Sequence, residues 1–233
     1  MAGIPYARAL IIGAGPGISA SLARQLSAAG LAVALAARNT AKLDDLARET
    51  GARAFAVDAA DPASVAALFQ AMDATLGEPD VVIYNASARV RGPLAGLEPE
   101  AVRRALEVSA FGGFLAVQQA AQRMQPHGAG AILLTGASAS VKGFAQSASF
   151  AMGKFALRGL AQSAARELGP QGIHVAHIVI DGAVRSAARP EPADQPDSML
   201  DPDAIAQAYL DLLRQPRSAW SLEMELRPWV EKF

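Results

Sequence analysis

The sequence predicts an α/β protein with a doubly wound, mostly parallel sheet and helices on both faces. Three observations favour this fold class. Short apolar runs alternate with segments of helical periodicity along the whole chain. The first apolar run ends in a glycine-rich turn that leads into a helix. The chain has 233 residues, 52% of them hydrophobic, which is enough for one large core. No linker is visible, so we expect a single domain over residues 1–233.

The first half of the chain contains four predicted strands separated by helices. Buried strands are expected at the apolar runs 9–12, 31–37, 54–57 and 81–84. Helical spacing places helices at 18–29, 40–50 and 62–76. Gly30 and Gly51 follow the first two helices, and Asp61 with Pro62 supplies the N-cap and first position of the third.

The second half repeats the alternation. Strands are expected at 131–135, 173–180 and, as an alternating pattern, 222–226. Helices are expected at about 100–125, at 149–168 before Gly169 and Pro170, and at 202–212. Residues 183–200 are rich in proline, aspartate and serine and predict a mobile loop.

Composition excludes several function classes. The 21 basic residues are unclustered and balance 22 acidic ones, which argues against a nucleic-acid partner. No cysteine is present, and His127, His174 and His177 are too dispersed to predict a metal site. No apolar run reaches membrane-spanning length or resembles a signal peptide, so we expect a soluble, cytoplasmic protein without a membrane partner.

The histidines and tryptophans have unremarkable expected roles. His174 and His177 lie three apart on a strand, so they should face opposite sides, and neither is proposed as a catalyst. His127 should be a solvated helix end. Trp220 and Trp229 flank the last strand and are expected to pack in the core or in a subunit contact.

The turn at residues 13–19 is typical of a dinucleotide site. Gly13, Gly15 and Gly17 let the backbone turn tightly and approach a pyrophosphate, while the helix that begins at Ile18 directs its N-terminus at the negative charge. A strict GxGxxG pattern would need glycine at position 18. A purely structural strand–helix turn is the alternative, and the absence of a Gly-Lys-Ser/Thr sequence excludes a Walker loop.

The residue at the end of the second predicted strand distinguishes NAD from NADP, because it contacts the adenosine ribose. An NAD site usually has an acidic residue there, whereas an arginine suits the 2′-phosphate of NADP. The sequence has Ala36, Ala37 and Arg38, so NADP(H) is favoured over NAD(H). The alternative is that Arg38 is a solvated loop charge.

Phe150 and Lys154 are four residues apart on a predicted helix and therefore share one face. A tyrosine at position 150 would complete a Tyr-x-x-x-Lys redox pair and could give a proton to a carbonyl oxygen. Phenylalanine has no O–H group and cannot do so. This position decides what chemistry the site can perform.

With these residues in place, the chain resembles the short-chain dehydrogenase/reductase family over nearly its whole length. The resemblance also rests on Asp58, the Asn85-Ala86-Ser87 segment, and residues 181–184. It implies a Rossmann-like fold in which Asp58 and Ala59 contact the adenine and residues 85–87 line the cofactor. It further implies that Lys154 binds the nicotinamide ribose and that Gly182 and Val184 lie at the nicotinamide amide.

The departures from the family pattern gather at the catalytic end. The relay asparagine aligns with Ser109, the catalytic serine with Ala137, and the tyrosine with Phe150. Ser138 follows one residue later. Either Ser138 or Lys154 would then supply the proton. Ser109 bonded to its own helix and Ser138 capping its loop are the alternative readings. Outside the relay, Ser19 replaces the third glycine of the turn and Asp181 replaces a proline.

The sequence leads to one functional hypothesis and two alternatives. We expect an NADP(H)-dependent oxidoreductase with an altered proton path, acting on a small carbonyl or alcohol. A cofactor-binding protein that acts through a partner surface without redox turnover is the second reading, and a lyase or isomerase that reuses the pocket is the third. By analogy with the family, a homodimer or homotetramer would form through the helices at 100–125 and 149–168.

Overall fold

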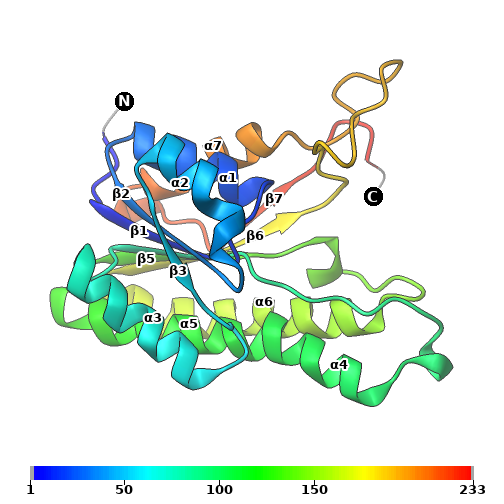
Figure 1. Ribbon diagram of the computed structural model, residues 1–233, viewed down its shortest axis with the longest axis horizontal. Helices are drawn as coiled ribbons and strands as arrows, with labels where there is room; N and C mark the ends of the chain where they lie inside the picture. The colour runs from blue at the N-terminus through cyan, green and yellow to red at the C-terminus, as the bar shows by residue number, and fades with distance from the viewer. Residues whose placement is uncertain (1–2, 232–233) are drawn as a thin grey trace.

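The computed structural model describes residues 3–231 and contains one parallel sheet of seven strands in the order β3-β2-β1-β4-β5-β6-β7 (Figure 1). The strands are β1 (Arg8–Ile12), β2 (Ala32–Ala37), β3 (Arg53–Ala56), β4 (Val81–Tyr84), β5 (Gly130–Thr135), β6 (Ile173–Ile180) and β7 (Glu223–Leu226). All six neighbouring pairs are parallel, which confirms the predicted fold class. The crossover from β3 to β4 reverses the strand order, and ligands bind at such a switch point.

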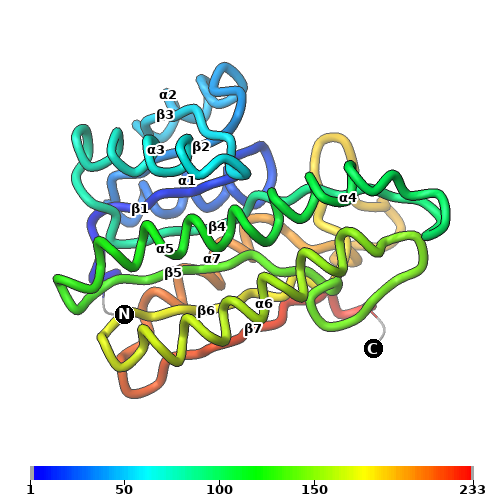
Figure 2. The backbone as a smooth tube through the Cα atoms, turned by 90° about the horizontal axis from the view of Figure 1, so that it is seen from below, coloured from blue at the N-terminus to red at the C-terminus, as the bar shows by residue number. Residues whose placement is uncertain are grey.

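Helices cover both faces of the sheet (Figures 1 and 2). One face carries α1 (Ile18–Ala28), α2 (Asp44–Thr50) and α7 (Pro202–Leu213), and the other carries α3 (Pro62–Thr75), α5 (Gly112–Met124) and α6 (Ala148–Leu168). Short α4 (Pro99–Leu106) projects beyond the carboxyl ends of the strands. None of the helices within residues 3–231 is long and apolar enough to cross a membrane.

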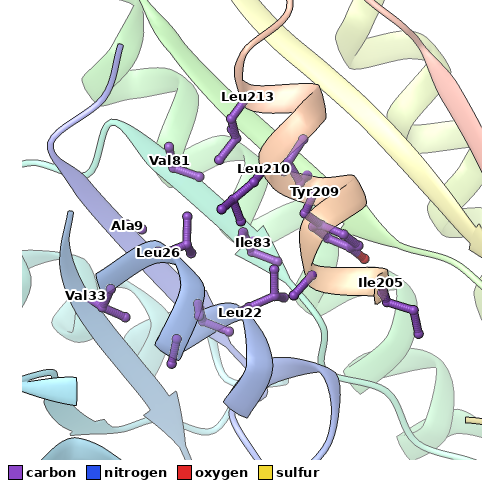
Figure 3. Close-up of a cluster of buried hydrophobic side chains, with 14 of the residues drawn as sticks. Ala9, Leu22, Leu26, Val33, Val81, Ile83, Ile205, Tyr209, Leu210 and Leu213 are labelled. Carbon is purple, nitrogen blue, oxygen red and sulfur yellow. The ribbon is translucent and has the colours of Figure 1, made fainter. Parts of the chain in front are cut away.

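The hydrophobic core between the sheet and helices α1 and α7 explains why the strands have apolar residues at successive positions. Leu22 and Leu26 of α1 lie beside Tyr209 and Leu210 of α7, above Ile83 of β4 (Figure 3). The side chains of all five are at least 97% buried. Strands covered on both faces need apolar residues at successive positions, and the predicted apolar runs have this pattern.

The helix expected at 100–125 is interrupted. A π-helical segment, Glu107–Phe111, separates α4 from α5. The Tyr84 hydroxyl, from β4, donates a hydrogen bond to the Val108 carbonyl within this segment. An outside donor to a helix carbonyl replaces part of the helix's own hydrogen bonding, and π-bulges often occur at functional sites. The interruption depends on a contact with β4, so helical periodicity alone did not predict it.

The segment 183–200 contains no helix and projects beyond the sheet as the gold loop in Figure 1. Its two ends are paired, because the Leu200 amide donates to the Ala183 carbonyl and the Arg185 amide donates to the Leu200 carbonyl. Arg185 also forms an ion pair with Asp201, the N-cap of α7. The loop is therefore closed at its base, beside the glycine turn.

Candidate cofactor and catalytic site

The glycine turn is held between β2 and the loop after β4. The amides of Gly13 and Ala14 both donate to the Ala36 carbonyl, at 2.9 and 3.0 Å. Gly13 has a φ of 87°, and a Cβ there would lie 2.3 Å from the Ala86 nitrogen. Both the backbone conformation and the close contact require glycine at this position.

Ser19, at the third glycine position of the family pattern, has a structural role that the sequence did not suggest. Its Oγ donates to the Gly13 carbonyl at 3.1 Å and accepts a hydrogen bond from Asn85 Nδ2 at 2.9 Å. The hydroxyl therefore ties the glycine turn to the loop after β4. The sequence departs from the pattern here, but the geometry of the turn is maintained by a different contact.

A cleft of about 420 Å³ opens at the carboxyl ends of β1, β2 and β4. Eleven of the predicted cofactor residues line this cleft or an adjoining hollow of about 260 Å³ at the start of α1. The cleft includes Gly13, Gly15, Arg38, Asp58, Ala59, Asn85, Ala86 and Ser87, and the hollow adds Gly17, Ile18 and Val184 to the shared Gly15 and Asn85. Gly182 lines neither space; a Cβ there would meet the Pro228 ring at 2.7 Å.

The cleft has the chemistry of a dinucleotide site. No atom lies within 4 Å of the Cβ positions of Gly15 and Gly17, so the backbone at both is open to a ligand. The N-terminus of α1 has no side-chain cap, which leaves its amides available to a phosphate. The residues present therefore fit a pyrophosphate bound across the turn.

Two cations stand at the end of β2. Arg38 and Lys42 both line the cleft, and both are exposed. Neither forms an ion pair within residues 3–231. Lys42 was missed at the sequence level, although it follows Arg38 by four residues in a segment with helical spacing. Across the cleft, the Asp58 carboxylate is fixed by the Ala60 amide, which donates to Oδ1 at 3.0 Å.

Lys154 is a buried lysine with one backbone partner. Its side chain on α6 is 3% exposed, and Nζ donates to the Thr135 carbonyl at the end of β5, at 2.6 Å. Burial lowers the pKa of Lys154 from 10.5 to about 8. An amine with this pKa can give or take a proton near neutral pH.

The Phe150 ring lies between two cations. Lys154 Nζ is 5.8 Å from the ring centroid, as the shared helix face predicted, and the Arg89 guanidinium carbon is 4.8 Å from it. Arg89 also donates to the Ser147 hydroxyl at 3.2 Å. Both contacts are of the cation–π kind. Arg89 had no signal in the sequence, because its contact with Phe150 joins a loop after β4 to a helix after β5.

The two candidate serines occupy different surroundings. Ser109, in the π-helical segment, accepts a hydrogen bond from the Ala88 amide at 3.0 Å and donates to the Ala88 carbonyl at 3.2 Å. The reading of Ser109 as bonded to its own helix is therefore wrong. Ser138 is half-buried, and the loop is capped by Ser140, whose hydroxyl accepts from the Ala137 amide at 3.1 Å. The capping reading of Ser138 is also wrong.

Asp181, where the family has proline, joins three segments at the mouth of the site. Its carboxylate is 3% exposed and lies 3.3 Å from Lys142 Nζ and 3.3 Å from Arg227 Nη2. Lys142 follows β5 and Arg227 follows β7, so the ion pairs hold the β5 loop and the C-terminal segment beside the end of β6. A proline could not make these contacts.

The remaining singled-out residues lie outside the cleft. His174 stacks on Trp220 with ring centroids 4.8 Å apart, and His127 pairs with Glu78 at 3.0 Å. Trp229 is 79% exposed, so it does not pack in the core of the single chain, and its packing in a subunit contact stays a prediction. Within residues 3–231, no group of three histidine or acidic side chains is arranged to hold a metal ion.

Comparison with known proteins agrees with this geometry. The family model described as short chain dehydrogenase matches residues 7–195. A cis-4-hydroxycyclohexanecarboxylate dehydrogenase from Sinomonas cyclohexanicum is 36% identical over 174 residues, which cover 72% of this chain and 69% of that protein. The matched part spans 56–69% of the first three curated relatives.

Two solved structures are similar over most of the chain. A short-chain dehydrogenase from Rhodopseudomonas palustris has a TM-score of 0.82 and 38% identity, and the match covers 96% of this chain and 99% of that one. A metagenomic short-chain oxidoreductase in complex with NADP has a TM-score of 0.86 and 26% identity, with 99% and 100% covered. The sheet order, the glycine turn and these matches lead to one conclusion: the chain belongs to the short-chain dehydrogenase/reductase family of oxidoreductases.

Proposed function

We propose that this protein is an NADP(H)-dependent oxidoreductase that interconverts a small carbonyl compound and its alcohol, with Lys154 as the group that carries the proton. The observation that carries the proposal is the cleft beside the glycine turn. It combines open backbone at Gly15 and Gly17 with two cations at the end of β2, Arg38 and Lys42, that have no carboxylate partner in residues 3–231.

The preference for NADP(H) follows from charge. A 2′-phosphate brings two negative charges to the end of β2, and arginine binds phosphate through two parallel hydrogen bonds. Lys42 lines the same cleft and adds a second positive charge. No acidic side chain occupies Ala36 or Ala37, where one would bind the ribose hydroxyls of NAD. The similarity to a structure in complex with NADP supports this assignment.

The chemistry of the site depends on Lys154. Bound NADPH would supply the hydride, and the chain must supply a proton to the carbonyl oxygen. The Phe150 ring cannot donate one. Lys154 shares a helix face with Phe150, and its pKa of about 8 leaves the ammonium largely protonated at pH 7. The same ammonium would stabilise negative charge that develops on the carbonyl oxygen.

A second function, cofactor binding without redox turnover, is supported by the three positions of the family's proton relay. Ser109, which aligns with the relay asparagine, has both of its hydrogen bonds to the Ala88 backbone. Phe150 and Ala137 also lack the groups of the family's relay. These three residues support the alternative of a protein that binds NADP(H) without redox turnover and acts through a partner surface. Binding is common to both functions, so it is the first property to test.

Calorimetric titration with NADPH tests the proposal. Wild-type protein should bind, whereas Gly17→Val should lose binding at least a hundredfold, since the new side chain fills the space above the turn. No atom of the neighbouring segments lies within 4 Å of the Gly17 Cβ position, so the new side chain has room, and circular dichroism checks that the variant folds. Gly159→Val, at an equally open position on the exposed side of α6, is the matched control. Normal NADPH binding by folded Gly17→Val would refute the site.

A further inference from the structure

His177 is a buried histidine, and one of its two ring nitrogens has no hydrogen-bond partner within residues 3–231. It lies on β6 and is 1% exposed, and its Nδ1 is 3.0 Å from Glu223 Oε2 on β7. Its Nε2 has no hydrogen-bond partner within residues 3–231. A buried polar atom left unpaired costs about 1–3 kcal/mol, so the arrangement calls for an explanation other than packing.

The free nitrogen and the candidate catalytic lysine lie against successive residues at the end of β5. Lys154 Nζ donates to the Thr135 carbonyl at 2.6 Å. The next residue is Gly136, where a Cβ would lie 2.3 Å from His177 Nε2. The ammonium and the free ring nitrogen thus lie against the same peptide, Thr135–Gly136. Only the absence of a side chain at position 136 lets the ring approach this closely.

Glu223 orients the ring. With its carboxylate near Nδ1, the imidazole keeps its hydrogen on Nδ1 and leaves a lone pair on Nε2, the arrangement of a carboxylate-oriented base. Arg158, one turn after Lys154 on α6, donates twice to Glu223 at 2.7 Å and holds the pKa of that carboxyl below its usual range. Glu223 therefore stays ionised, and burial lowers the pKa of His177, so the ring is neutral at pH 7.

The charged groups that face His177 come from two elements. Glu223 belongs to β7, and Lys154 and Arg158 belong to α6. The α6 face thus presents Lys154 and Arg158, one turn apart, towards the imidazole. Of these three groups, only the Glu223 carboxylate favours a proton on His177. The Glu223 side chain is 30% exposed, so this carboxylate is in contact with solvent.

We propose that His177, oriented by Glu223, exchanges a proton with Lys154 and serves the site as its proton relay. In the transfer, one N–H bond of the Lys154 ammonium breaks as the proton passes to a bridging water molecule, which in turn gives a proton to His177 Nε2, since no hydrogen bond joins the two nitrogens directly. The amine becomes neutral, and the imidazolium formed is stabilised by the Glu223 carboxylate. Proton return reverses the step. This inference rests on the proposed role of Lys154, but the exchange itself involves only residues of this chain.

Ring-nitrogen NMR tests the coupling without any turnover. The protein has three histidines, which single substitutions can assign. Replacing the neighbouring ammonium in Lys154→Met should raise the pKa of His177 by at least about half a unit. His174 faces the opposite side of the sheet and is the internal control. An unchanged His177 pKa would overturn the relay, whatever the protein's activity.

Kinetics distinguish a relay from a structural histidine. His177→Gln keeps an N–H donor for Glu223 but cannot take up a proton near neutral pH. We expect it to lower kcat by roughly tenfold to a hundredfold, and we expect imidazole buffer at fixed pH to restore part of the loss. His174→Gln should change neither. A His177→Gln variant with normal kcat, or with a loss of kcat that imidazole does not restore, would show that the ring has only a structural role in its contact with Glu223 of β7. If wild type turns over no carbonyl compound but the NMR coupling is present, the relay stands and the proposed activity fails.

Discussion

Phe150 determines the rate that the proposed site can reach. Its ring lies 5.8 Å from Lys154 Nζ and 4.8 Å from the Arg89 guanidinium, so it is surrounded by positive charge. A hydroxyl added to this ring would have its ionised form favoured by both cations. The apolar ring is thus in surroundings that suit a phenol.

We expect Phe150→Tyr to increase carbonyl reduction by up to roughly a hundredfold, because it adds a positioned proton donor beside an ammonium. NADPH oxidation with small aldehydes, ketones and quinones at matched cofactor occupancy measures the gain. Phe150→Leu is the control for altered packing and should show no increase. If Phe150→Tyr leaves the rate unchanged or lowers it, the added hydroxyl does not act as a proton donor, and this account of position 150 is wrong.

The buried Lys154 ammonium should lower the free energy of unfolding, because burial disfavours its charged form. A pKa lowered from 10.5 to about 8 corresponds to roughly 3 kcal/mol against folding while the amine is charged in both states. This penalty is fully present below pH 8 and disappears as the pH rises towards 10.5. Lys154→Met should therefore raise the free energy of unfolding at pH 7 and raise it much less at pH 10. Urea unfolding at both values measures the difference; equal effects at both would contradict a buried ammonium.

Sequence reasoning found the residues of the site whose signals are local. The glycine turn, Arg38 and the Phe150–Lys154 pair follow from spacing along one turn or one helix. Arg89, Ser19 and His177 were missed in their present roles because each depends on a contact between distant segments. Asp181 was seen only as a missing proline, whereas its ion pairs to Lys142 and Arg227 require the sheet to bring three segments together.

At the scale of elements, the strands were predicted almost completely, since a sheet covered on both faces needs continuous apolar runs. The predicted strand bounds differ from the observed ones by at most one residue at either end. The interruption between α4 and α5 was not predicted, because the Tyr84 hydroxyl that bonds the Val108 carbonyl comes from β4. Helical periodicity predicts which face of a helix is buried. It does not predict an interruption that is caused by a contact with another element.

The junction of β2 with the 3-10 turn Thr40–Leu43 should select the cofactor. We expect Arg38→Ala to weaken NADPH binding at least tenfold and to leave NADH binding nearly unchanged, because only NADPH carries the 2′-phosphate. Lys42→Ala should have the same sign and a smaller effect. Calorimetry of the wild type and both variants with each cofactor measures the six affinities. Equal affinity of the wild type for NADPH and NADH would contradict the assignment.

At the scale of the whole molecule, an apolar surface lies along α5 and α6, which run side by side in Figure 2. Phe111, Phe114, Met152 and Phe155 are each 42–51% exposed, and the rings of Phe111 and Phe114 stack. Large apolar side chains grouped on a surface favour association with another chain. We propose that these helices form the contact between two copies of the protein.

Light scattering coupled to size-exclusion chromatography tests this contact. Wild type should be a dimer or tetramer at micromolar concentration, and Phe114→Glu combined with Phe155→Glu should be a folded monomer, because charges placed in an apolar interface lose hydration without a partner. Leu94→Glu, at a residue that is 77% exposed and belongs to neither helix, should leave the assembly intact. A monomeric wild type would exclude the interface.

Single-turnover oxidation of NADPH, followed by stopped-flow absorbance with a carbonyl panel between pH 6 and pH 10, tests the central claim most directly. Wild type should oxidise NADPH with at least one carbonyl compound, and the rate should fall as the pH rises through about 8, where Lys154 loses its proton. Lys154→Met should lower the rate at least a hundredfold and abolish this pH dependence. A Lys154→Met protein that binds NADPH and matches the wild-type rate would show that the proton comes from elsewhere and would contradict the proposed mechanism.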